Sequence, residues 1–199
     1  MSTLRDTWES GGVAHGAWLS VPDTVTAEAA ARVGFEYVCI DTQHGLAEYS
    51  DARSMLQAMQ VGTGTPTVRV PWNEPGIIGR MLDAGAMAII IPMVNSVEEA
   101  EAAVAACRYA PAGARSFGPA RVGMQEGPGY YDKANAEVAC VPMIETTQAI
   151  SRLDDILAVP GIDAVYIGPA DLSITLGLPP GNNDDSPEFT EALQTVVAA

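Results

Sequence analysis

The sequence contains few of the residues on which several kinds of protein chemistry depend. Lysine occurs once, as Lys133 in a polar stretch. Schiff-base catalysis needs a lysine whose pKa is lowered by burial or by a nearby cation, so we expect no Schiff-base lysine here. Lys and Arg together number 10 against 25 Asp and Glu, and the formal net charge is −15. A field of this sign disfavours binding to nucleic acid and to anionic membrane surfaces.

Cysteine and long apolar runs are scarce as well. The cysteines are Cys39, Cys107 and Cys140, an odd number without paired spacing, which argues against a disulfide framework and favours buried thiols. The N-terminus lacks a signal-peptide pattern, and no apolar run approaches the ~20 residues of a spanning helix. We therefore expect a soluble, cytoplasmic protein.

The residues that are present predict one α/β domain covering 1–199. Hydrophobic residues make up 48% of the 199 residues, which suffices for a buried core. Continuous apolar runs, typical of buried parallel strands, alternate with segments of helical apolar spacing. We expect strands at 15–20, 35–41, 65–70, 86–94, 138–145 and 164–171, helices at 4–10, 23–32, 49–60, 75–83, 96–109, 146–162 and 187–199, and loops at 111–135 and 175–186.

The repeat of about 25 residues matches a TIM, or (β/α)8, barrel. Such a barrel needs about 250 residues, whereas this sequence contains about six β/α units and ends inside a predicted helix. We expect a barrel truncated after about six units, with its C-terminal units missing from the sequence. An open six-stranded sheet is the alternative.

Two of the predicted strands end in a carboxylate, at Glu145 and at Asp171. Residues at the carboxyl ends of parallel strands line the active site in barrels of this kind. Two carboxylates brought together there would repel each other unless a cation lies between them. The pattern therefore predicts a divalent-metal site formed by Glu145 and Asp171.

Further candidates lie after the second strand, inside the third strand and at the end of the helix that follows the third strand. His44 lies three residues beyond Asp41 and is either a general base or a loop histidine that caps a backbone carbonyl. Arg69, inside an apolar strand, must bind an anion or pair with an acid such as Asp41, and both can hold together. Asp83 is disfavoured at the end of its helix and is expected to have a partner, for which we name His44. His15, at the start of the first strand, is expected to be structural.

The turn Gly168-Pro169-Ala170-Asp171 is either a plain tight turn or a set of backbone N–H groups facing a substrate carboxylate. The spacing alone does not distinguish these two interpretations.

These segments together resemble the HpcH/HpaI aldolase family of metal-dependent class II pyruvate aldolases, related to 4-hydroxy-2-oxoheptanedioate aldolase. The resemblance runs from about Gly16 to Gly177. It rests on the segments IDTQHG, VRVP, LDAGA, IIPMV, RYAPAGARSFG, MIET and IGPADLS, in this order.

The resemblance implies a TIM barrel of the phosphoenolpyruvate/pyruvate type and a reversible aldol cleavage of 4-hydroxy-2-oxo acids into pyruvate and an aldehyde. It implies that Glu145 and Asp171 bind Mg2+, Mn2+ or Co2+, ions that prefer oxygen ligands. Pyruvate would chelate the metal, Arg69 would stabilise the enolate, and backbone N–H groups of Ala170 and Asp171 would hold the carboxylate. His44, oriented by Asp83, would be the base, with Asp41 in support.

The resemblance also implies a homo-oligomer, often a hexamer, with a 2-oxo acid and an aldehyde as small-molecule partners. The segment 111–135, with Arg115 and Arg121, would reach the active-site rim or a subunit interface. Many family members carry Gln where this sequence has Met143, two residues before the metal-binding Glu. We therefore expect a changed pyruvate contact or donor preference.

Three alternatives stay open at this stage. A citrate-lyase-like enzyme acting on acyl-CoA also uses strand-end acids and a metal, although this sequence offers few cations for CoA phosphates. Oxaloacetate decarboxylation would use the same enolate chemistry. The non-enzyme alternative is a barrel fragment with a structural or interaction role, because an open sheet has unpaired edges.

Overall fold

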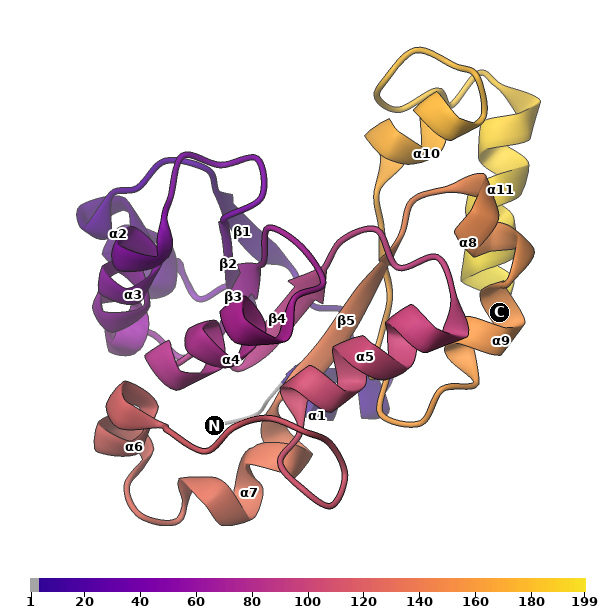
Figure 1. The fold of residues 1–199 in the computed structure, drawn as a ribbon. Coiled ribbons are helices and arrows are strands. Elements are labelled where there is room, and N and C mark those ends of the chain that lie inside the picture. Colours follow the sequence, from indigo (N-terminus) through magenta and orange to yellow (C-terminus); the bar gives the residue numbers. More distant parts are fainter. Residues whose placement is uncertain (1–3) are drawn as a thin grey trace.

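The computed structural model describes residues 4–199 as a six-stranded, all-parallel sheet with the strand order β1-β2-β3-β4-β5-β6. The sheet curls into a half-barrel flanked by helices (Figure 1). The strands are β1 (Gly16–Leu19), β2 (Tyr37–Asp41), β3 (Thr65–Arg69), β4 (Ala88–Ile91), β5 (Ala139–Ile144) and β6 (Tyr166–Ile167).

Apart from the first helix, which precedes β1, the helices follow the strands along the chain and flank the sheet. They are α1 (Leu4–Glu9), α2 (Thr24–Val33), α3 (Tyr49–Ala58), the 3-10 turn η1 (Met59–Val61), α4 (Pro75–Ala84), α5 (Val97–Cys107), α6 (Ala120–Glu126), α7 (Tyr130–Glu137), α8 (Thr147–Ser151), α9 (Leu153–Leu157), α10 (Pro169–Thr175) and α11 (Pro187–Ala198). Among residues 4–199, none of these helices is long and apolar enough to cross a lipid bilayer.

Local chemistry accounts for where the helices begin and end. Asp23 accepts a hydrogen bond from the backbone of Thr26 at the start of α2, and Ser96 caps α5 in the same way. Gly34 and Gly85 end α2 and α4 in the left-handed conformation, which favours glycine. These boundaries agree with the sequence prediction to within a few residues.

The two faces of the sheet carry different clusters. The outer face packs against the helices through branched side chains such as Val38, Ile40, Val68, Ile89 and Ile144. The concave face holds a smaller cluster formed by Leu4, Cys39, Ala88, Ile90, Ala139, Val141 and Met143, against which Trp8, Trp18, Tyr37 and Tyr166 also pack. Successive residues of a strand alternate between these two faces. The side chains on the concave face therefore point into the half-barrel, and those near the strand ends converge there.

Two expectations about segments outside the sheet are wrong. Residues 111–135 are not one long loop, because α6 lies within them and α7 begins in them. Gly127 and Gly129 flank these helices as caps, while Val122, Tyr130 and Ala134 bury their apolar sides. The expected single helix at 146–162 is two short helices, α8 and α9, separated at Arg152, whose backbone is not helical.

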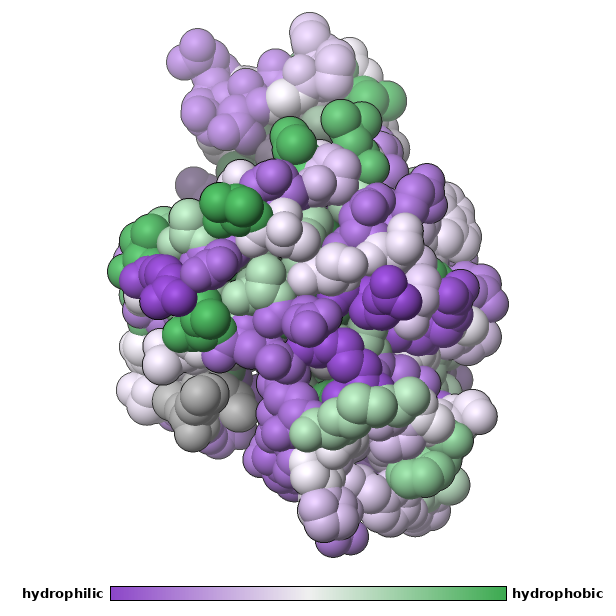
Figure 2. Space-filling view, turned by 90° about the vertical axis from the view of Figure 1, so that its left-hand side faces the viewer, coloured by the Kyte–Doolittle hydropathy of each residue, from purple (hydrophilic) through white to green (hydrophobic). Residues whose placement is uncertain are grey.

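All three cysteines are free and buried, as the sequence predicts. Hydrophilic residues predominate on the face drawn in Figure 2, where hydrophobic residues occur as small separate groups. This agrees with the net charge of −15.

Candidate active site at the carboxyl ends of the strands

Asp41 and Arg69 are the last residues of β2 and β3, and Glu145 directly follows β5. The β2–β3 register pairs Asp41 with Arg69, so both side chains emerge at the same edge of the sheet. The structure thus brings together three of the residues that the sequence places after apolar runs.

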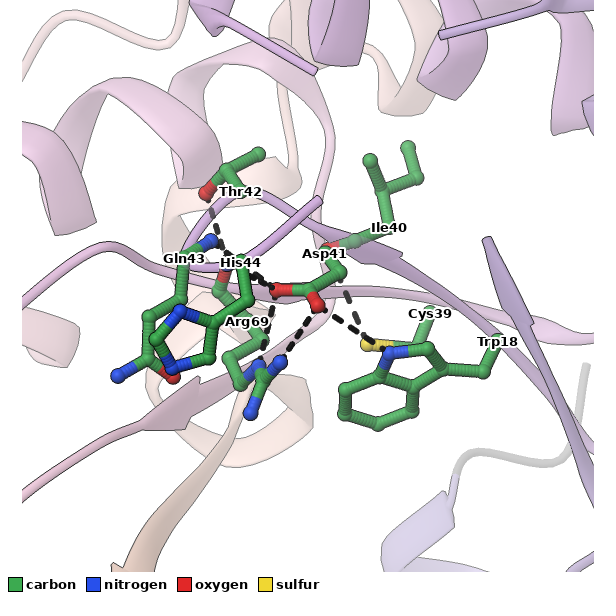
Figure 3. Close-up of polar contacts among 8 residues, drawn as sticks. All are labelled: Trp18, Cys39, Ile40, Asp41, Thr42, Gln43, His44 and Arg69. Atoms are coloured by element: carbon green, nitrogen blue, oxygen red, sulfur yellow. Dashed lines mark hydrogen bonds and ion pairs between the residues drawn. The ribbon is translucent and has the colours of Figure 1, made fainter. Parts of the chain in front are cut away.

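Asp41 and Arg69 form a two-point ion pair (Figure 3). Arg69 donates from Nε to Asp41 Oδ1 at 2.9 Å and from Nη2 to Oδ2 at 2.5 Å. The backbone N–H groups of Gln43 and His44 donate to Oδ1 at 3.0 and 3.2 Å. Burial acts to raise the pKa of Asp41, but the hydrogen bonds from Arg69 and the backbone outweigh it, and the pKa lies below its ordinary value. Asp41 is therefore ionised and fixes the guanidinium.

Glu145 is a carboxylate with almost no exposed surface, 1% of the residue. Its Oε1 accepts the backbone N–H of Met93 at 2.7 Å. Burial raises the pKa of Glu145, the Met93 hydrogen bond opposes this, and the negative charge of Asp171 raises the pKa further. The two carboxylates thus act on each other at a place where a bound cation would relieve both burial and repulsion.

Met93 has a φ of 57°, in the left-handed region that a side chain other than glycine rarely adopts. This conformation turns its N–H group toward Glu145. Asn95 Nδ2 donates to the Met93 carbonyl at 2.8 Å and thereby supports the turn. Met93 cannot be recognised from the sequence, because a backbone conformation of this kind leaves no sequence signal at a methionine.

Gly168 lies against Glu145 in a space that admits no side chain. A Cβ atom at Gly168 would be 2.3 Å from Glu145 Oε2 and 2.7 Å from its Cβ. The close approach explains a glycine at this position, where the backbone itself forms one wall of the Glu145 carboxylate.

The sequence predicts that Asp171 directly follows a strand, and this prediction is wrong. β6 ends at Ile167, and Asp171 lies in the first turn of α10. Pro169 at the start of this helix fixes its first turn, since proline is favoured there. Asp171 is half-buried and still near enough to Glu145 to affect its pKa.

His44 lies in the loop after β2 and is exposed. Figure 3 shows its ring on the same side of Asp41 as the side chain of Gln43. The charges of Arg69 and His44 both act to lower the pKa of Glu145, after the larger effects of burial, Met93 and Asp171. His15, as expected, lies before β1 at the other end of the sheet, where its N–H donates to Glu36.

The expected pairing of Asp83 with His44 is not found in this chain. Asp83 lies in the last turn of α4, whose end leads into the amino end of β4, and its partner is Arg115 at 2.8 Å. A helix of a βα unit runs antiparallel to its strand, which places Asp83 and His44 at opposite ends of the sheet. Burial raises the pKa of Asp83, and Arg115 opposes the rise.

Arg115 and Arg121 bind inward rather than at the rim of this site. Arg121 donates to the carbonyl oxygens of Ala84 and Leu56. Arg115 donates to Asp83 and to the hydroxyl of Tyr130. Both arginines therefore dock the α6–α7 segment onto the ends of α3 and α4.

The donor set fits a hard divalent cation with incomplete protein ligation. Within residues 4–199, no group of three or more His, Cys, Asp or Glu side chains is arranged to hold a metal. Glu145 and Asp171 supply two carboxylates, so water and substrate oxygens would complete the shell, as in Mg2+ sites.

Comparison with known proteins agrees with this fold. Residues 15–199 match the HpcH/HpaI aldolase/citrate lyase family. The chain is 41% identical over 196 residues to the hydroxypyruvate/pyruvate aldolase of Rhizorhabdus wittichii, covering 98% of this chain and 78% of that protein. It is 38% identical to the 4-hydroxy-2-oxo-heptane-1,7-dioate aldolase of Salmonella paratyphi C, covering 98% and 75%.

Among solved structures, an HpcH/HpaI aldolase/citrate lyase family protein from Burkholderia cenocepacia superposes with a TM-score of 0.90 at 31% identity, covering 100% of this chain and 80% of that one.

Proposed function

Because the chain belongs to the HpcH/HpaI aldolase/citrate lyase family, we propose that it is a carbon–carbon lyase that cleaves 4-hydroxy-2-oxo acids reversibly into pyruvate and an aldehyde, with a bound divalent cation. The observation that carries the proposal is that Arg69 and Glu145 emerge at the same edge of the sheet, close enough for the charge of Arg69 to lower the pKa of Glu145. A guanidinium fixed by Asp41 and a buried acid next to Asp171 share one edge of the sheet. An enolate needs this combination of a fixed donor and a cation.

Glu145 and Asp171 would hold Mg2+, Mn2+ or Co2+. A cation bound there would act as a Lewis acid and stabilise negative charge on the oxygen of the enolate. The Met93 N–H group holds Glu145 in place for this role. Gly168 leaves room for the carboxylate in this position, since any side chain there would collide with it.

The remaining residues would bind and orient the substrate. Asp41 occupies Nε and Nη2 of Arg69, and within residues 4–199 no protein group takes Nη1, which is left to donate to the substrate's keto or enolate oxygen. Backbone N–H groups of Ala170 and Asp171, in the turn formed with Gly168 and Pro169, would hold the carboxylate.

His44 would move the proton. In cleavage it would accept the proton of the C4 hydroxyl, through a water molecule, while the C3–C4 bond breaks and its electrons form the enolate. In synthesis it would return the proton to the new alkoxide. The structure gives no role to Asp83 of the same chain in orienting His44.

The donor is pyruvate or a close analogue. One relative is named for hydroxypyruvate as well as pyruvate, and Met143 replaces the Gln of many family members beneath this site. Met143 is buried, with its Cε 3.0 Å from the position of a Cβ at Gly168. Because an apolar thioether cannot make the contacts of a Gln amide, both pyruvate and hydroxypyruvate should be tested as donors. Oxaloacetate decarboxylation would use the same enolate site, whereas the few cations of the chain disfavour an acyl-CoA substrate.

The half-barrel also supports a proposal about the whole fold. The curl of six parallel βα units fits a single-domain (β/α)8 barrel of the phosphoenolpyruvate/pyruvate type, and a homo-oligomer is expected from the family.

The test is pyruvate release from a 4-hydroxy-2-oxo acid, coupled to lactate dehydrogenase. EDTA-stripped protein is assayed alone and with Mg2+ or Mn2+, next to Glu145→Gln and the control Glu101→Gln, which alters an exposed acid on α5. We expect activity restored by metal in wild type and control, and lost in Glu145→Gln. Folded wild-type protein without activity under any of these metals would overturn the proposal.

A further inference from the structure

Trp18 contacts both members of the Arg69–Asp41 pair. Its indole Nε1 donates to Asp41 Oδ2 at 3.4 Å, and the Arg69 guanidinium carbon lies 5.0 Å from the centre of the indole ring. Figure 3 shows the ring beside the carboxylate that Arg69 grips. One side chain on β1 thus contacts both Asp41 at the end of β2 and Arg69 at the end of β3.

Trp18 also reaches the last strand of the described sheet. Its ring centre is 5.3 Å from that of Tyr166, with the planes tilted by 33°. Tyr166 belongs to β6 and precedes Gly168 by two residues. Because β1 and β6 are the two edges of the sheet, this contact spans its concave face and joins the Arg69 side of the site to the Gly168 side.

Packing alone would not require a tryptophan here. The concave cluster combines small side chains such as Ala88 with large apolar ones such as Ile90 and Tyr37, and a large apolar residue other than tryptophan could pack against them. Trp18 differs from a leucine in two respects that matter to Arg69: a π face for a cation and one N–H donor for Asp41.

We propose that Trp18 is a positioning residue for Arg69, an inference that rests on the proposed function. Asp41 fixes one edge of the guanidinium, and the indole face limits its rotation out of that plane. Without a further contact, Arg69 would be free to break its pair with Asp41 when negative charge develops on the substrate. Trp18 contacts both residues and keeps the pair intact, so that only Nη1 of Arg69 donates to the substrate. Donors fixed in advance stabilise a developing charge better than donors that must reorient.

The test compares Trp18→Leu, which removes the π face and the N–H, with Trp18→Phe, which keeps a π face. Trp8→Phe, at the amino end of the sheet in the same cluster, is the matched control.

The first readout is the affinity for oxalate, a planar dianion that resembles an enolate, in the presence of Mg2+. Weakening by roughly tenfold is expected for Trp18→Leu, with partial rescue to about threefold in Trp18→Phe, from the usual strength of cation–π contacts. The kcat should fall more than the KM rises.

A second readout needs no turnover and no metal. The Nε–H resonance of Arg69, identified by its loss in Arg69→Lys, should exchange with water faster in Trp18→Leu than in wild type or Trp8→Phe. Folded Trp18→Leu with unchanged oxalate affinity and unchanged Arg69 exchange would overturn the inference. If wild-type protein releases no pyruvate and binds no oxalate, the proposed function fails, and Arg69 exchange alone still decides the positioning role.

Discussion

Arg69 and Asp41 occupy paired positions at the ends of two neighbouring strands, and two guanidinium nitrogens meet the two oxygens of one carboxylate. Such a fork geometry is available to arginine and not to lysine. The pair is nearly enclosed, with 13% of the Arg69 side chain and 4% of the Asp41 side chain exposed. The same ion pair therefore stabilises the fold and keeps the Arg69 guanidinium in position for the substrate.

Asp41→Asn tests this link through pH. The folded-state pKa of Asp41 is lowered by Arg69 and backbone donors against the effect of burial, so the ionised acid stabilises the fold above its unfolded pKa of about 3.9. We expect Asp41→Asn to cost about 3 kcal/mol at pH 7, the usual result of leaving a buried charge unpaired. The difference from wild type should shrink as the pH falls below about 4 through the folded-state pKa. Urea unfolding across this range measures it; a pH-independent difference would contradict the ion-pair account.

Gly168→Ala tests the close approach to Glu145. The added methyl group would lie 2.3 Å from Glu145 Oε2, so the carboxylate or the turn must move. We expect Mg2+-dependent activity and oxalate affinity to fall by roughly tenfold or more, as expected when a ligand group shifts by about 1 Å. Gly79→Ala is the control, because its methyl group would meet nothing within 4 Å and should favour the helix. Equal activity in both variants would show that Glu145 is not confined.

Asp163→Asn tests a network at the amino ends of the strands. Asp163 pairs with Arg5 and Arg108 and accepts the backbone N–H of Cys140 at 2.7 Å. Removing its charge leaves the buried Arg108 unbalanced, and we expect a loss of about 3 kcal/mol of stability with unchanged KM. Thermal melts and kinetics beside the exposed Asp155→Asn measure both. A raised KM would place Asp163 in the site after all.

Arg115→Lys tests how the α6–α7 segment is held. Arg115 lies 4.4 Å from the centre of the Tyr109 ring and donates to Asp83 and Tyr130. Lysine cannot make the same planar contacts, so we expect a loss of about 2 kcal/mol and faster proteolysis within residues 111–129. The exposed Arg53→Lys is the control and should change stability by less than about 0.5 kcal/mol. Unchanged proteolysis would mean that Arg121 alone is sufficient to hold the segment.

The ends of β2, β3 and β5 were predicted well, because each of these strands is an apolar run that ends in a charged residue or is followed by one. Asp41, Arg69 and Glu145 stand out for that reason, and parallel strands put such residues at one edge. The Asp41–Arg69 pair followed from the cost of burying an unpaired guanidinium. These arguments depend on local composition and on one rule of topology.

The errors arose where tertiary contacts decide. Gly127 and Gly129 favour a loop by composition, but in the structure they cap α6 and α7, and contacts with α4, among them that of Arg121, hold α6 in place. The partner of Asp83 could not be chosen from spacing, since Arg115 lies 32 residues away in the sequence. Trp18 does carry a sequence signal, because strand alternation puts it on the concave face, where Asp41 also lies.

The order in which the strands pair has a consequence for folding. Every neighbour pair in this sheet is parallel and is joined through an intervening crossover, so no two strands can meet as a quick local hairpin. Arg69 ends β3 and Glu145 follows β5, two strands that are brought together only when β4 has paired with both. Oxalate affinity would therefore be among the last properties to appear during refolding, well after helical circular dichroism has returned.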